Sequence, residues 1–105
     1  MKARRLDLSE CTVDTPDGPK PYALRKSLTN LLCSPHRELN GAALLKAHRL
    51  ATLIEDEESD SLLLSDEQYK ELESAFETFR GFVATDAEMV KRVLEAPEVD
   101  VEEKQ

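Results

Sequence analysis

Apolar positions in the first two thirds of the chain repeat at the 3.6-residue period of an amphipathic helix. The period predicts one helix over residues 22–32, and Pro35 must end it because a proline cannot continue a helix. A second helix runs to about residue 57, and either Ser34 or Asn40 could cap its start. The apolar positions of these two helices are Leu24, Leu28, Leu31 and Leu32, and then Ala43, Leu44, Ala47, Leu50, Ala51 and Ile54.

Two further helices are marked by capping signals. Ser65 and Gln68 have the spacing of a capping box, in which each side chain bonds a backbone N–H near the other. This box predicts a third helix that ends at Gly81, and a second box at Thr85 predicts a fourth helix that ends at Pro97. Their predicted core stripes are Tyr69, Leu72, Phe76 and Phe79, and then Met89, Val90, Val93 and Leu94.

The remaining segments lack a helical period. Residues 6–13 alternate loosely between apolar and polar side chains and predict a short strand. Residues 14–21 contain three prolines and an Asp-Gly pair, which indicate a turn or an extended loop. Leu62–Leu64 is too short for a helix face, so we expect it to lie extended against the N-terminal strand.

These elements predict a mainly α (α+β) fold, in which a short N-terminal strand or hairpin precedes about four short helices in one compact domain. A length of 105 residues is that of a single domain. We place this helical domain at residues 6–96. Residues 1–5 are interpreted as a flexible basic arm, and residues 97–105 as a disordered acidic tail.

Charge is divided unevenly between the two halves of the chain. The net charge is -8, but residues 1–50 carry nine basic and five acidic side chains, and residues 51–105 carry five and seventeen. This separation favours a basic protein partner, or association between copies of the chain as a homo-oligomer. Direct binding of nucleic acid is disfavoured, because phosphate contacts need clustered positive charge and no aromatic residues interleave the basic ones.

The composition also limits where the protein is expected. No apolar run approaches the roughly 20 residues of a membrane span, and no apolar segment follows the basic start as a secretory signal would require. We therefore expect no membrane association and a cytoplasmic location. Two cysteines are too few for a disulfide scaffold.

Cys33 and His36 are the closest pair of transition-metal ligands in the sequence. Their spacing resembles half of a zinc knuckle, but Cys11 and His48 do not form the second close pair that a structural zinc site needs. We therefore predict no metal and no cofactor, with a small zinc-binding module as one alternative. No glycine-rich oxyanion turn accompanies Cys33, so we predict no catalytic residue and no enzyme.

The acidic half offers the clearest candidate for a binding surface. Many carboxylates lie along the predicted third helix, and an apolar run precedes it. Such a row could imitate the phosphates of nucleic acid, or it could be the solvent face of an amphipathic helix. The predicted partner-binding residues are Leu62, Leu63, Glu67, Glu71, Glu73 and Glu77.

The order of the motifs resembles that of small accessory proteins of tailed phages and prophages. The matching segments are Leu6-Asp7-Leu8, the turn Asp17-Gly18-Pro19, the leucine-rich first helix, Leu64-Ser65-Asp66 with Tyr69 and Leu72, and Val93-Leu94-Glu95-Ala96. The resemblance implies a role in the cytoplasm of a bacterial host cell through protein contacts, as an assembly chaperone or adaptor or as a modulator of a host machine. The alternative function is an acidic nucleic-acid mimic that inhibits a DNA- or RNA-binding protein.

Overall fold

The computed structural model describes residues 2–100, apart from the side chain of His36. The described residues form four helices and five strands in two small sheets, so the fold is α+β. In chain order the elements are β1 Lys2–Asp7, β2 Cys11–Thr15, β3 Gly18–Tyr22, α1 Leu24–Leu32, α2 Gly41–Asp56, β4 Ser61–Leu64, α3 Asp66–Thr78, α4 Ala87–Leu94 and β5 Glu98–Asp100. Short 3-10 turns at Pro35–Arg37 and Ala84–Asp86 precede α2 and α4.

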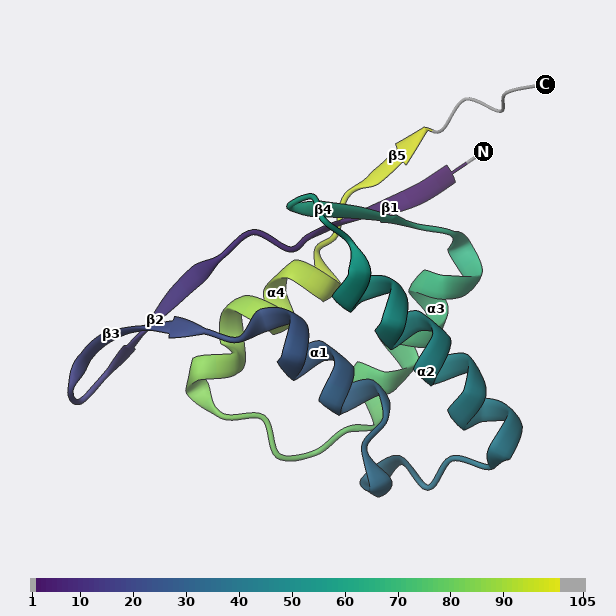
Figure 1. Cartoon of the computed structure of the whole chain (residues 1–105), viewed down its shortest axis with the longest axis horizontal. Helices are drawn as coiled ribbons and strands as arrows, with labels where there is room; N and C mark the ends of the chain where they lie inside the picture. Colours follow the sequence, from purple (N-terminus) through teal and green to yellow (C-terminus); the bar gives the residue numbers. More distant parts are fainter. Residues whose placement is uncertain (1, 101–105) are drawn as a thin grey trace.

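The N-terminal residues form the centre of a sheet. β1 pairs antiparallel with β4 on one side and with β5 on the other, with Leu6 opposite Leu62 and Ala3 opposite Val99 (Figure 1). The prediction that residues 1–5 are a flexible arm is therefore wrong for residues 2–5. The predicted disordered tail also contains a strand, β5, while residues 101–105 lie outside the described part. The expected pairing of Leu62–Leu64 with the N-terminal strand is confirmed.

The single strand predicted over residues 6–13 is divided in two. The Asp7 carboxylate accepts hydrogen bonds from the Ser9 backbone N–H at 2.9 Å and from the Ser9 hydroxyl at 2.6 Å, which turns the chain after β1. β2 and β3 then form a hairpin that projects from the helices (Figure 1). The segment predicted as a loop is thus largely strand, with its turn at residues 16–17 and Gly18 at a φ of +103°.

The helices α2 and α3 begin at side-chain caps, whereas α1 and α4 have none. Asn40 begins α2, because its side chain accepts a hydrogen bond from the Ala43 N–H at 2.8 Å. The capping box of Ser65 and Gln68 is confirmed at α3. The box predicted at Thr85 is wrong: Asp86 accepts a hydrogen bond from the Val83 N–H at 3.0 Å in the preceding 3-10 turn.

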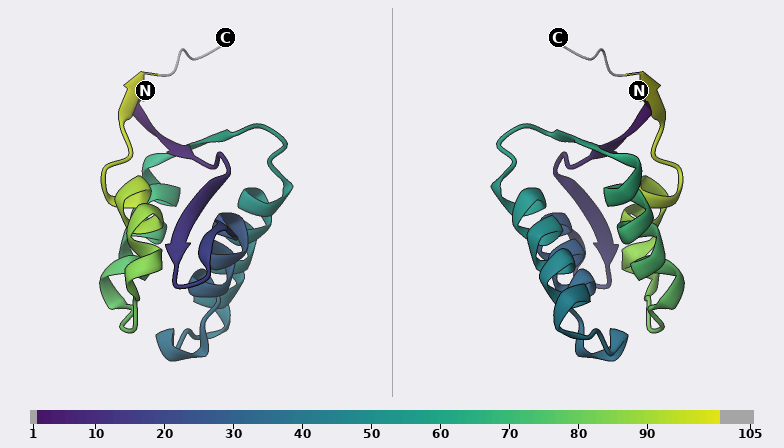
Figure 2. Two further views of the ribbon diagram at one scale, coloured as in Figure 1. Left: turned by 90° about the vertical axis from the view of Figure 1, so that its left-hand side faces the viewer. Right: turned by 90° about the vertical axis from the view of Figure 1, so that its right-hand side faces the viewer.

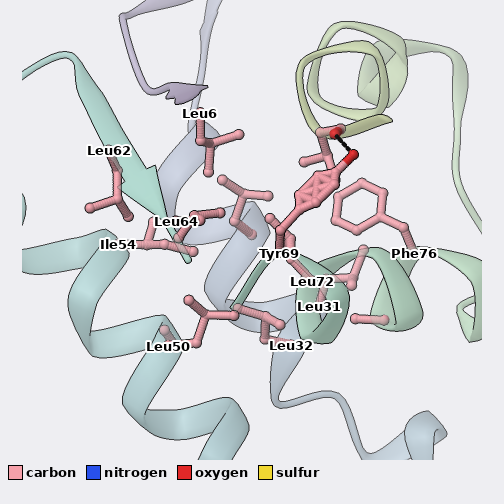
Figure 3. Packing of buried hydrophobic residues seen from close by; sticks show 14 of the residues in the cluster. Leu6, Leu31, Leu32, Leu50, Ile54, Leu62, Leu64, Tyr69, Leu72 and Phe76 are labelled. Carbon is pink, nitrogen blue, oxygen red and sulfur yellow. Dashed lines mark hydrogen bonds between the residues drawn. The ribbon is translucent and has the colours of Figure 1, made fainter. Parts of the chain in front are cut away.

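The core lies between the three-stranded sheet and two pairs of helices. α1 packs on α2, α3 packs on α4, and the sheet crosses one end of both pairs (Figures 1 and 2). The Tyr69 ring is buried in this core, and its hydroxyl donates a hydrogen bond to the Val93 carbonyl at 2.9 Å (Figure 3). Two predicted core residues, Leu44 and Leu94, are exposed, because each lies at the border of its helix's apolar stripe. The most deeply buried side chains are Leu6, Leu28, Leu32, Ile54, Leu64, Leu72 and Val93.

Both tyrosines of the chain should ionise at a higher pH in the native protein than in the unfolded protein. Burial, and then the neighbouring Asp86, raises the pKa of Tyr22 to about 12, and burial also raises the pKa of Tyr69. A raised folded pKa contributes stability that is complete below the unfolded value near 10 and is lost as pH rises through the folded value. We expect the tyrosinate absorbance of native protein to develop well above that of urea-unfolded protein. Coincident titrations of the two states would contradict the buried environment.

Candidate functional site

The two leucines predicted to bind a partner have opposite environments. Leu62 is 6% exposed and points into the core, whereas Leu63 is 47% exposed on the outer face of the sheet. Side chains alternate between the faces of a strand, so β4 can present only one of these neighbours to a partner. The assignment of Leu62 to a partner surface is therefore wrong, and Leu63 stays available.

The four predicted glutamates do not form one continuous acidic row. Glu67 and Glu71 are four residues apart and share the side of α3 that faces α2, whereas Glu73 and Glu77 share another side. Between them Lys70 forms an ion pair with Asp66 at 3.2 Å on the exposed face. The acidic surface of α3 is therefore interrupted and split.

Glu67 and Glu71 form one wall of a groove between α2 and α3. This α2–α3 groove has a volume of about 450 Å³, and the α2 wall carries the cations Lys46 and Arg49. Its apolar floor consists of Leu50, which is buried, and Leu53, which is 38% exposed. The complete lining is Lys46, Arg49, Leu50, Leu53, Glu67, Gln68 and Glu71.

The α2 wall follows directly from the spacing of residues along the helix. Positions 46, 49, 50 and 53 are separated by one and two turns, so they lie along one side of α2. The apolar period predicted that Leu50 belongs to the core stripe of its helix. It missed Leu53, although the i, i+3, i+4, i+7 spacing of these four residues carried a signal.

A buried arginine positions part of the acidic wall. The Arg37 side chain is 6% exposed, and its Nη2 lies 3.6 Å from the Glu71 Oε1. Its Nη1 donates a hydrogen bond to the Leu32 carbonyl at 2.6 Å. A buried guanidinium needs a carboxylate partner, so Glu71 serves the fold as well as lining the groove. This ion pair joins the basic half of the chain to the acidic half.

The other charges of the groove have no partner within residues 2–100. None of the ion pairs or hydrogen bonds in this part of the chain involves the side chains of Lys46, Arg49 or Glu67. The groove therefore presents two free cations and one free carboxylate on opposite walls, with an apolar strip between them. Such an arrangement suits a protein segment that carries an apolar side chain between charges of both signs.

Known proteins offer no assignment for this chain. No protein family, characterised protein or solved structure matches it.

A second hollow is a weaker candidate. It has a volume of about 310 Å³ and is lined in part by Phe79, Phe82 and Met89. Its carboxylate, Asp86, already accepts hydrogen bonds from the Tyr22 hydroxyl at 2.6 Å and from the Val83 N–H. The hollow therefore lacks the unpaired charges that distinguish the α2–α3 groove.

The two cysteines that were candidate metal ligands do not line this groove. Cys11 and Cys33 are half-buried free thiols, and the side chain of His36 lies outside the description. Among the side chains that are described, no group of three or more His, Cys, Asp or Glu could hold a metal ion. None of the helices in residues 2–100 is long and apolar enough to cross a membrane.

Proposed function

We propose that this protein is a non-enzymatic interaction module that binds a protein partner through the α2–α3 groove. The observation that carries this proposal is the set of unpaired charges of both signs beside an apolar floor. Lys46 and Arg49 can bind an acidic side chain of the partner, and Glu67 a basic one. Leu53 supplies the apolar contact that charges alone would lack.

The class of protein proposed here is an accessory protein that acts in the cytoplasm as an adaptor, an assembly chaperone or a modulator of a host machine. The order of motifs that resembles tailed-phage accessory proteins supports this class. Both helices of the groove present exposed side chains at its rim, Lys46 and Arg49 on α2 and Glu67 on α3.

Mimicry of nucleic acid is supported less well by the geometry. A mimic needs a dense row of carboxylates, but the four glutamates of α3 divide between two sides of the helix. One of them, Glu71, is also held by Arg37. The cations of the groove would repel the positively charged protein that a mimic must bind.

Charge reversal in the groove should weaken capture of the partner. We expect wild-type protein to capture a partner from nuclease-treated lysate of its source organism, and Arg49→Glu and Leu53→Asp to reduce the captured amount at least about tenfold, or 1.4 kcal/mol. Lys26→Glu is the matched control, because Lys26 is an exposed cation on α1 outside the groove. Thermal unfolding would verify that each variant is folded.

Three results would count against the proposal. Equal capture by the groove variants and by wild type would place the partner on another surface. Capture of a nucleic-acid-binding protein that moderate salt releases, and that Glu73→Gln with Glu77→Gln abolishes, would favour mimicry. Native mass spectrometry that detects one bound zinc, lost in Cys33→Ser, would instead favour the zinc module.

A further inference from the structure

We infer that the partner that fits the α2–α3 groove is a second copy of this chain, docked groove to groove across a two-fold axis. This inference rests on the proposed function of the groove and names its occupant. It requires a surface that is complementary to itself, because a two-fold interface brings the same patch of both copies together.

The charges of the groove meet this requirement. When two grooves face each other across a two-fold axis, the cationic α2 wall of each copy can lie against the acidic α3 wall of the other. The cations Lys46 and Arg49 are one helical turn apart on α2, and the carboxylates Glu67 and Glu71 are one turn apart on α3. Side chains with this spacing are about 5–6 Å apart on both helices, so the two pairs match in sign and in separation.

The free charges also explain why pairing happens between copies rather than within one. Lys46, Arg49 and Glu67 line the same groove, yet they form no ion pair with each other in the described chain. A second copy satisfies these charges twice, once on each side of the axis. It thereby offsets the repulsion between two chains whose net charge is -8 each.

Apolar surface is available on the floor of the groove and on α2 beside it. Leu53 lies on the floor of the groove, and Leu45 lies two turns earlier on α2 and is also exposed. Together with Arg49 they follow the i, i+4, i+8 row of one helix, which forms a ridge on its surface. Docking the two grooves would remove this leucine surface from water. The exposure of these two leucines has no explanation in the monomer alone.

The test is a charge exchange between two variants of the full chain. Sedimentation equilibrium would give the dimer dissociation constant of wild type, of Arg49→Glu and of Glu67→Lys, each alone. We expect wild type to dimerise, and each variant to raise the dissociation constant at least about tenfold, because two like-charge contacts replace two ion pairs.

An equimolar mixture of the two variants should restore the dimer. In the mixed pair, the new carboxylate of one variant faces the new amine of the other, and the unchanged Arg49 and Glu67 still face each other. Controls are Lys26→Glu and Glu77→Lys, which change the same charges outside the groove and should leave the dimer unchanged. Far-ultraviolet circular dichroism would show that every variant is folded.

Three results would overturn the inference. Wild type that stays monomeric up to about 100 µM would exclude a useful dimer, although capture of another protein that depends on Arg49 would leave the proposed function intact. A dimer that both variants leave unchanged would use a different surface. A mixture that fails to restore the dimer would show that the two walls do not meet.

Discussion

Deleting residues 1–5 should lower the free energy of unfolding by about 4 kcal/mol or more, at roughly 1 kcal/mol for each intramolecular hydrogen bond lost. The deletion removes all three residues of β1 that pair with β5, and two that pair with β4. It also removes the Arg4 guanidinium, whose Nη1 donates a hydrogen bond to the Ala96 carbonyl at 2.9 Å and which lies 4.7 Å from the centre of the Tyr69 ring. Urea denaturation would measure the loss.

A matched control separates the strand from its charge. Arg5→Ala removes an exposed side chain but keeps the backbone pairing of β1, so its effect should stay within about 0.5 kcal/mol. If the deletion is as mild as this substitution, β1 does not hold the sheet together and residues 1–5 are the dispensable arm that their composition predicts.

Arg25→Met should destabilise the protein by at least about 3 kcal/mol, since it removes three hydrogen bonds from a charged group and such bonds contribute about 1.5–3 kcal/mol each. The Arg25 guanidinium on α1 donates hydrogen bonds to three carbonyls at and beyond the end of α2. These belong to Ile54 at 2.9 Å, to Glu57, and to Ser59 at 2.8 Å. The positive charge also interacts favourably with the carboxyl end of the α2 dipole. Chemical denaturation of the purified variant would test this value.

The neighbouring Lys26 provides the comparison for Arg25. Lys26→Met removes an exposed cation one residue away and should change the free energy of unfolding by no more than about 0.5 kcal/mol. Arg25→Lys keeps the charge but cannot reach three carbonyls with a planar fork, so its loss should fall between the two. Equal stabilities for Arg25→Met and Lys26→Met would show that the hydrogen bonds from Arg25 to the end of α2 contribute nothing to the free energy of unfolding.

Helices could be predicted closely because their signals are local. The leucine period of α1, the stop at Pro35 and the capping box at Ser65 involve residues no more than about four positions apart. The box at Thr85 failed because the Asp86 carboxylate accepts the Val83 N–H instead, and a distant residue supports this turn. Tyr22 donates a hydrogen bond to Asp86, which holds that carboxylate in the 3-10 turn before α4.

Strands depended on partners that the local pattern does not reveal. Lys2–Asp7 is too basic to resemble a central strand, yet β4 and β5 supply hydrogen bonds to both of its edges. The register with β4 also decides that Leu62 faces the core and Leu63 faces outward, since a shift of one residue would exchange them.

The acidic wall of the candidate site could be predicted from the sequence. Glu67 and Glu71 were selected as members of an acidic helix, but nothing local separates them from Glu73 and Glu77. Only the approach of α2 to α3 places the first two glutamates opposite Lys46 and Arg49 and makes a groove with walls of opposite charge.

The sequence by itself determined the helices, the capping box of α3 and the uneven distribution of charge, because these follow from composition and from contacts within one or two helical turns. The tertiary structure decided which charges are free. Three arginines of the basic half have different roles: Arg25 binds the end of α2, Arg37 is buried against Glu71, and Arg49 stays unpaired in the groove. Long side chains reach partners far away in the sequence, so their roles are set by the packing of helices and not by neighbouring residues.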